Sequence, residues 1–185
     1  MTPPGEPNRF TEIYSRHYGD VYAYCRRRVG PDGVDDLVAD VFTSVWKRIE
    51  DAPPTESALP WIYRIAFNKT GNHWRARSRR KSLQSRLEES GATHVATPIA
   101  DQVIVREEVR EVLDVANRLS VSDLEVLRLS LWEQLTHVEI AEVLAMKPNA
   151  VKQRVHRAKK RLIEEYERAT GRPAVPLEEP LGDES

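Results

Sequence analysis

Apolar residues repeat most regularly over residues 34–50. The positions that recur at steps of three and four are Leu37, Val38, Val41, Phe42, Val45, Trp46 and Ile49. This spacing predicts an amphipathic helix with one buried side. Asp35, Asp36 and Asp40 crowd its first turns, where negative charge suits the helix dipole. These acids fit a solvated helix start as well as they fit a docking surface for a basic partner.

Two further helices are predicted in the first half of the chain. Residues 1–8 are rich in proline, so we expect a disordered N-terminus before them. Residues 9–28 carry apolar side chains at helical spacing, and Gly30 with the following proline should end that helix. Another helix should have Pro60 in its first turn and continue to about Ser85.

The helix predicted after Pro60 mixes aromatic rings with polar and basic side chains. Tyr63, Phe67 and Trp74 follow one another along one side of it. The side chains beside these rings include Lys69, Asn72, His73 and Arg75. Single-stranded nucleic acid is bound by such surfaces, because bases stack on rings while cations follow the backbone. The alternative is that the rings belong to the core, which we expect for Trp61 and Phe67 but not for Trp74.

The second half of the chain begins with a segment that has no periodicity. Residues 87–101 contain glycine, proline and scattered small side chains, which predicts a flexible linker. A helix should return over residues 101–119. Ser122 followed by Glu125 has the form of a capping box, which predicts the start of the next helix.

A helix-turn-helix pattern follows over residues 136–162. Thr136 and Glu139 have the capping-box spacing, and the helix they start should break at Met146, Lys147 and Pro148. The next helix has an apolar stripe at steps of four, three and four, made of Val151, Val155, Ala158 and Leu162. The pattern therefore predicts two helices that meet at a tight turn.

The opposite face of that last helix is polar and basic. It carries Lys152, Gln153, His156, Arg157 and Lys160, and no acidic residue occurs between Lys147 and Arg161. Such a face has the charge to lie against phosphates and the donors to contact base edges in a major groove. We therefore predict duplex DNA binding by this helix. Basic amphipathic helices also bind membranes or partner proteins, and this pattern alone leaves those alternatives open.

Charge and composition sharpen this picture. The 185 residues have a net charge of −1, yet the charged residues from Arg64 to Arg86 are all basic. A neutral total does not exclude a nucleic-acid partner, because phosphates respond to local charge. Cys25 is the only cysteine, and we expect a buried structural thiol. Membrane insertion is not expected, since no apolar run approaches the roughly 18–20 residues that span a bilayer. We expect a cytoplasmic protein.

Two signatures in the right order give the chain a resemblance to a known family. They are DDLVADVFTSVWKR followed by LPWIYRIAFNKTGNHWRARSRR, and the helix-turn-helix ending AVKQRVHRAKKRL. These segments resemble the bacterial sigma-70 superfamily of RNA polymerase sigma factors, and the short architecture is similar to its extracytoplasmic-function group. The resemblance implies an all-α fold of two small helical domains joined by a flexible linker.

The domains that this resemblance implies can be placed on the sequence. Residues 9–86 would form sigma region 2, and residues 102–169 would form sigma region 4 with the helix-turn-helix. Residues 87–101 would be the linker between them. Residues 170–185 are rich in proline and acids, which predicts a disordered tail.

The resemblance also implies site residues and partners. Core RNA polymerase would bind through its β′ clamp coiled coil and its β flap, and the matching docking residues are Asp35, Asp36, Leu37, Asp40, Val41 and Phe42. The melted non-template strand of the promoter −10 element would contact Asn68, Lys69, Asn72, His73, Trp74, Arg75, Arg77, Arg79 and Arg80. The −35 duplex would contact Lys147, Asn149, Lys152, Gln153, His156, Arg157 and Lys160.

Some expectations concern regulation and chemistry. An anti-sigma protein is a plausible further partner by resemblance, and no residue identifies it. We expect no catalytic residue, cofactor or metal, because the acids near Asp36 crowd one helix start without histidine or a second cluster. A stand-alone helix-turn-helix regulator is the alternative function, although it leaves Asn72 and Trp74 unexplained. Lys147 stands where relatives often carry a capping residue, so the last helix could instead start at Asn149.

Overall fold

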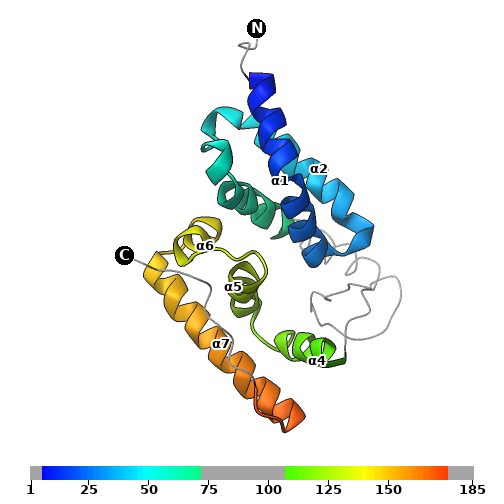
Figure 1. Ribbon diagram of the computed structural model, residues 1–185, viewed down its shortest axis with the longest axis vertical. Helices are drawn as coiled ribbons and strands as arrows, with labels where there is room; N and C mark the ends of the chain where they lie inside the picture. Colours follow the sequence, from blue (N-terminus) through cyan, green and yellow to red (C-terminus); the bar gives the residue numbers. More distant parts are fainter. Residues whose placement is uncertain (1–5, 72–106, 175–185) are drawn as a thin grey trace, which may run out of the picture. The chain divides into compact units, whose positions relative to one another are not determined.

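The computed structural model describes residues 6–71 and 107–174, and all helices discussed below lie in those ranges. The chain divides into two compact units, Met1–Ala100 and Asp101–Ser185, and each is described by itself. The regular elements of the described residues are all helical (Figure 1). The predicted all-α class with two helical domains is confirmed, while the linker predicted at residues 87–101 lies outside the described residues.

The first unit is built on two packed helices, α1 (Glu6–Val29) and α2 (Val34–Lys47). Six of the seven apolar positions of the periodic pattern are buried, so the predicted buried side is confirmed for them, whereas Trp46 is 46% exposed and its predicted burial is wrong. Gly30 links the helices with a φ of 78°, a left-handed conformation that glycine adopts without strain. The helix predicted over residues 34–50 is too long at its C-terminal end, because α2 ends at Lys47 and Ile49–Asp51 forms a separate short 3-10 helix.

The connection after α2 is held against α1 by polar side chains. It contains a second 3-10 helix, Thr55–Ser57, and leads into a helix described over residues 59–71. The guanidinium of Arg9 donates to the carbonyl groups of Ala52 and Pro53. Buried His17 donates from Nε2 to the Thr55 carbonyl at 2.7 Å. The bonds from Arg9 give acceptors in the irregular connection a donor, and the bond from His17 adds a second donor to the Thr55 carbonyl, which also accepts from the Ala58 amide.

An aromatic stack ties α1 to the helix over residues 59–71. The rings of Tyr24 and Tyr63 are stacked with centroids 4.6 Å apart, and the guanidinium of Arg28 lies 3.4 Å from the Tyr24 centroid. Arg28 is 2% exposed, and its Nη1 donates to the Tyr24 carbonyl at 3.1 Å. The buried cation is therefore a structural part of the core. Cys25, which follows Tyr24 in the sequence, is also buried, as expected of a structural thiol.

Over residues 107–174 the second unit contains four helices, α4 (Glu107–Ala116), α5 (Val121–Leu131), α6 (His137–Leu144) and α7 (Pro148–Thr170). Helix α7 packs against each of the other three. Its predicted apolar stripe, Val151, Val155, Ala158 and Leu162, is buried as expected. In the described ranges no helix has the length and apolar content needed to cross a membrane.

The helix starts of the second unit show one correct prediction and one error. The capping box at α6 is complete, since Thr136 Oγ1 accepts from the Glu139 amide and the Glu139 carboxylate accepts from the Thr136 amide. The capping box predicted for Ser122 and Glu125 is wrong. Ser120 caps α5 instead, accepting from the Asp123 amide at 3.1 Å. The helix begins two residues earlier than the pattern indicated, and Glu125 is buried.

Left-handed residues flank α6 on both sides. Gln134 has a φ of 53° before the helix, and Ala145 has a φ of 54° at its C-cap. The Ala145 amide donates to carbonyl groups of the last turn, and this turn directs the chain into α7. A side chain in this conformation costs roughly 1–2 kcal/mol, because Cβ approaches the following carbonyl oxygen. The turn of the helix-turn-helix is thus formed without glycine.

Candidate nucleic-acid interfaces

Helix α7 presents the exposed polar face that the sequence predicts. We call this the α7 face, and its exposed side chains are Lys152, Gln153, His156, Arg157 and Lys160. The buried stripe on the other side fixes the rotation of the helix, so this face points away from the core of the unit. A cationic helix face of this kind, held on a helix-turn-helix, suits the major groove of a DNA duplex.

The start of α7 leaves the Asn149 amide as its available first-turn donor, since Pro148 has no amide hydrogen and the Ala150 amide donates to the Lys147 carbonyl at 2.9 Å. Lys147 is the N-cap residue and Pro148 follows in the first turn, so the alternative start at Asn149 is wrong. The Lys147 side chain makes no capping hydrogen bond, and the first turn contains no acidic residue. Helix N-termini with free amide groups attract anions. Lys147 and Asn149, both exposed, stand at this helix start.

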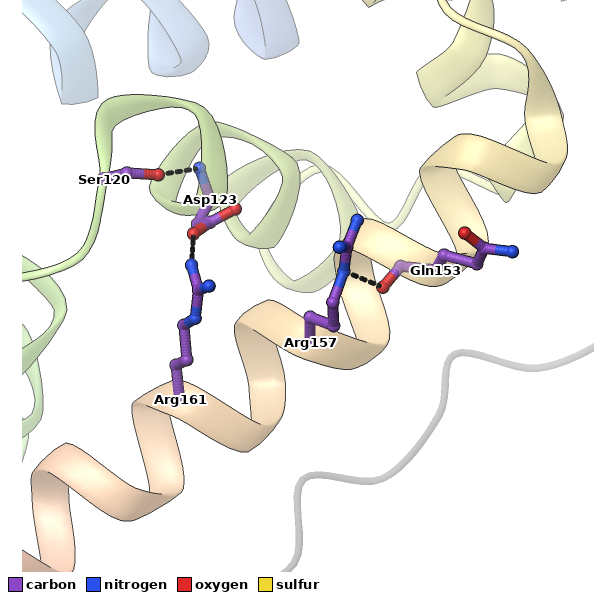
Figure 2. A network of polar contacts seen from close by, with 5 residues as sticks. All are labelled: Ser120, Asp123, Gln153, Arg157 and Arg161. Carbon is purple, nitrogen blue, oxygen red and sulfur yellow. Dashed lines mark hydrogen bonds and ion pairs between the residues drawn. The ribbon is translucent and has the colours of Figure 1, made fainter.

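Two cations of the α7 face, Arg157 and Lys160, make only local contacts within the helix. Figure 2 shows Gln153 and Arg157 one turn apart, with Arg157 Nε donating to the Gln153 carbonyl at 3.3 Å. Lys160 Nζ lies 3.8 Å from a Glu164 carboxylate oxygen in an exposed pair. Exposed pairs of this type contribute little to stability. Both cations can therefore reorient toward a phosphate or a base at small cost.

One cation near the α7 face was missed by sequence reasoning. Arg161 Nη1 donates to Asp123 Oδ2 at 2.6 Å, across 38 residues of sequence (Figure 2). No local pattern could have shown this pair, because Asp123 lies on α5. The available signal was the position of Arg161 one turn beyond Arg157 on α7.

The single-strand face predicted for the first unit is only partly described. On the helix over residues 59–71, Asn68 is exposed and Lys69 is half-buried. Thr70, which follows Lys69, is buried and donates from Oγ1 to the Ala66 carbonyl at 2.8 Å. The other predicted residues lie outside the described residues, namely Asn72, His73, Trp74, Arg75, Arg77, Arg79 and Arg80.

Tyr63 is a correction to the predicted single-strand face. The sequence grouped it with Phe67 and Trp74 as a ring available to bases, but Tyr63 is 2% exposed and stacks on Tyr24. Trp61 is buried, as expected, and Phe67 is half-buried. The physical reason is that α1 covers the side of the helix on which Tyr63 lies. Its ring therefore stabilises the helix that carries Asn68 and Lys69.

The predicted polymerase-docking residues divide into a surface set and a core set. Asp35, Asp36 and Asp40 are exposed on α2. Leu37, Val41 and Phe42 are at most 4% exposed, so their assignment to a docking surface is corrected to a core position. They face α1 because the apolar side of an amphipathic helix packs inward. We call the three exposed acids the α2 acidic face.

Aromatic residues border the α2 acidic face. Tyr14 and Tyr18 on α1 contact Phe42, with ring centroids 4.7 and 6.0 Å apart, and both tyrosines are more than a third exposed. The pKa of the Tyr18 phenol is raised, first because neighbouring groups desolvate it and then because nearby tyrosines and Asp35 oppose a negative charge. Tyrosine is enriched at protein interfaces, and the acids beside these rings add charge that can select a basic partner.

Across the two described ranges, no three histidine, cysteine, aspartate or glutamate side chains lie together as a metal site would require.

Comparisons with known proteins agree with this arrangement of two modules. The model of sigma-70 region 2 matches residues 13–80, and the model of sigma-70 region 4 matches residues 110–162. The chain is similar to RNA polymerase sigma factor NccH of Alcaligenes xylosoxydans, at 30% identity over 85% of this chain and 87% of that protein. It is 31% identical to RNA polymerase sigma-E factor of Streptomyces coelicolor, over 87% of this chain and 88% of that protein.

Solved structures share the fold. A complex of the sigma factor RpoE with the anti-sigma factor NepR from Bartonella quintana matches with a TM-score of 0.62 at 22% identity, over 84% of this chain and 95% of that chain. CnrH in complex with the cytosolic domain of CnrY matches with a TM-score of 0.57 at 23% identity, over 83% and 84%.

The two family models cover most of the helices described above, in the order that the two sequence signatures predict. Curated relatives that match over most of their length carry the same function in their names. The chain therefore belongs to the extracytoplasmic-function group of the sigma-70 family and is a sigma factor that directs RNA polymerase to promoters.

Proposed function

We propose that this sigma factor recognises its promoters in two different states of DNA. The α7 face binds the −35 element as a paired duplex, and the helix over residues 59–71 with the residues after it holds the −10 element as a single strand. The observation that carries the proposal is the exposed cationic face of α7, whose direction is set by a fully buried stripe. The chain's role is positioning, and the synthesis of RNA belongs to the polymerase.

Recognition of the duplex rests on the chemistry of α7. Its amide, imidazole and guanidinium groups at Gln153, His156 and Arg157 can pair with base edges, whereas Lys152 and Lys160 can contact phosphates. Lys147 and Asn149 stand where the helix start would approach the DNA backbone. These contacts would set the register of the protein on the promoter before any strand opens.

Capture of the opened strand rests on the first unit. Asn68 and Lys69 lie at the described end of a helix that the Tyr24–Tyr63 stack holds rigidly. The residues expected to complete this surface are Asn72, His73, Trp74, Arg75, Arg77, Arg79 and Arg80. An extruded base costs a few kcal/mol of unstacking, which a pocket with amide and aromatic groups can offset. The module would therefore trap DNA that has already opened.

Run-off transcription tests the proposal as a whole. Purified chain would be combined with core RNA polymerase on a genomic library, and the start sites would be mapped. Specific start sites that share two spaced elements are the expected result. At one mapped promoter, Asn72→Ala and Trp74→Ala should reduce permanganate reactivity of the opened strand more than they reduce initial duplex binding. Unchanged footprints in both variants would contradict the single-strand assignment.

Docking on the polymerase is proposed for the α2 acidic face. Asp35, Asp36 and Asp40 offer negative charge beside exposed tyrosines, which suits a basic surface such as the β′ clamp coiled coil. The second unit would bind the β flap, and the complex would act in the cytoplasm. The double variant Asp36→Lys/Asp40→Lys should lose binding to core polymerase in a pull-down. Glu56→Lys, which reverses an exposed charge in the 3-10 helix Thr55–Ser57, is the control and should bind normally.

An anti-sigma partner is a further part of the proposal. The solved relatives RpoE and CnrH are held in complexes with NepR and with the cytosolic domain of CnrY. A comparable protein would keep this chain from the polymerase until a signal releases it. Affinity purification of the chain from its own cells should recover one protein in stoichiometric amount, and addition of that protein should block run-off transcription. Recovery of core polymerase alone, in all growth conditions, would contradict this part.

A further inference from the structure

Arg161 is the one cation of α7 whose described partner lies on α5. Its Nη1 donates to Asp123 Oδ2 at 2.6 Å, while 59% of its side chain stays exposed. Figure 2 shows it one turn beyond Arg157 on α7, with the guanidinium directed to the first turn of α5. The same side chain is thus fixed at one atom and open to solvent over most of its surface.

Asp123 is itself held in place. Its amide donates to the capping oxygen of Ser120 at 3.1 Å, and its side chain is only 10% exposed. The carboxylate stands in the first turn of α5, where the helix dipole stabilises negative charge. The helix dipole and the Arg161 guanidinium both stabilise this carboxylate. The carboxylate can therefore orient Arg161 while most of the guanidinium stays exposed to solvent.

We infer that Arg161 is a further phosphate-contacting residue of the duplex-binding surface, and that Asp123 is the positioning residue that directs its guanidinium. This inference rests on the proposed binding of duplex DNA by the α7 face. An arginine has N–H donors in a rigid fork, so one nitrogen can bond the carboxylate while others bond a phosphate. Arg161 lies one turn farther from the start of α7 than Arg157, so in the proposed complex it would lie nearer the DNA backbone that borders the groove.

Preorganisation is the advantage of this arrangement. A free arginine side chain loses rotamer freedom when it contacts DNA, which weakens the contact. Arg161 has already lost that freedom in the ion pair. Arg168, two turns later on α7, makes the useful contrast. Its partner Glu165 is on the same helix, and its side chain is 68% exposed, so nothing on another helix fixes its direction.

The test measures how duplex binding depends on salt. Full-length protein would be titrated onto a fluorescent duplex of mixed sequence between 50 and 200 mM salt, because phosphate contacts do not depend on sequence. Loss of one phosphate contact should reduce the slope of log K against log[salt] by about 0.9. We expect Arg161→Ala to show this reduction. Its affinity deficit should therefore shrink about threefold across that range.

Arg168→Ala is the matched control and should keep the parental slope. Partial unfolding cannot imitate the expected result, since a smaller folded fraction lowers the affinity by the same factor at every salt concentration. Equal slopes in Arg161→Ala, Arg168→Ala and the parent would overturn the inference.

Substitution of Asp123 tests the positioning role. Asp123→Ala should weaken duplex binding in the parent and have no such effect in the Arg161→Ala background, because the carboxylate acts through the guanidinium. Tighter binding in Asp123→Ala would overturn the inference, since it would show that the carboxylate masks the cation. An equal loss in both backgrounds would assign Asp123 a purely structural role and would overturn its part.

Failure of this inference can be separated from failure of the proposed function. Arg157→Ala should weaken binding to the mapped −35 duplex if the α7 face binds DNA. A loss with Arg157→Ala but none with Arg161→Ala overturns only the inference about Arg161. If both variants bound the duplex as tightly as the parent, the proposal that the α7 face binds duplex DNA would be wrong.

Discussion

The proposed DNA-binding helices of the two units are supported in different ways. In the first unit Arg28 is buried against Tyr24 and helps to hold the helix that carries Asn68. In the second unit the cations of the α7 face are exposed over a stripe of aliphatic residues, and a buried arginine of this unit, Arg128, lies on α5. The difference fits the two tasks proposed. An opened strand requires a rigid platform for individual bases, whereas a duplex requires one charged helix that fits its groove.

The largest effect is expected when the stack of Tyr24 and Tyr63 is removed from the first unit. Tyr63→Ala should destabilise the first unit by about 3–5 kcal/mol, because it leaves a cavity and removes the ring that stacks on Tyr24. Hydrogen exchange should show faster opening of the helix over residues 59–71 and unchanged protection of α7. Tyr63→Phe keeps the ring and should retain most of the stability. Equal protection in the Ala variant and the parent would refute a core role for Tyr63.

The next largest effect concerns the exposed cations. Arg157→Ala should weaken binding of the holoenzyme to a −35 duplex by about 1–3 kcal/mol if its guanidinium contacts a base. The hydrogen bond from Arg157 Nε to the Gln153 carbonyl is local and exposed, so stability should change little. Fluorescence anisotropy with matched and mismatched duplexes would measure both affinity and specificity. A large loss of stability without loss of specificity would argue that Arg157 is structural.

Sequence reasoning identified buried helix faces better than it identified contacts between helices. The apolar stripe of α7 and the periodic pattern of α2 identified buried sides correctly, because helical spacing is a local property. Tyr63 was misassigned because only its contact with Tyr24 shows which side is covered. Arg28 and Asp123 were missed for the same reason. A charged residue in an amphipathic pattern is read as solvated unless its partner, far away in sequence, is known.

The α6 start offers a smaller test within the second unit. Thr136→Ala removes the oxygen that accepts from the Glu139 amide and should cost about 1 kcal/mol of stability. Thr136→Ser keeps that oxygen and should behave nearly as the parent. Urea unfolding of the pair would measure the difference. If both variants were equally stable, the capping box would contribute nothing to the second unit.

Sequence reasoning found this capping box but misplaced the cap of α5. Ser120 precedes α5 and Ser122 lies in its first turn, and the spacing from Ser122 to Glu125 favoured the wrong serine. The main chain decides between them, since only Ser120 has an extended conformation that lets its side chain accept from Asp123. The choice between nearby capping residues therefore depended on geometry that composition does not show.

The smallest expected effect comes from the left-handed turn. Ala145→Gly should stabilise the second unit by about 0.5–1 kcal/mol, because glycine adopts a φ of 54° without strain. Ala39→Gly makes the same chemical change at an exposed position inside α2 and should destabilise by about 1 kcal/mol. Opposite signs in urea unfolding would confirm the turn conformation. Destabilisation by both substitutions would contradict it.

The most direct test of the whole account uses one mapped promoter and two DNA probes. Holoenzyme with Arg157→Ala and holoenzyme with Asn72→Ala would each be titrated onto a −35 duplex and onto the single-stranded −10 sequence. We expect a crossed pattern, in which Arg157→Ala loses affinity for the duplex alone and Asn72→Ala loses affinity for the single strand alone. Equal losses on both probes in both variants would contradict the division of labour between the two units.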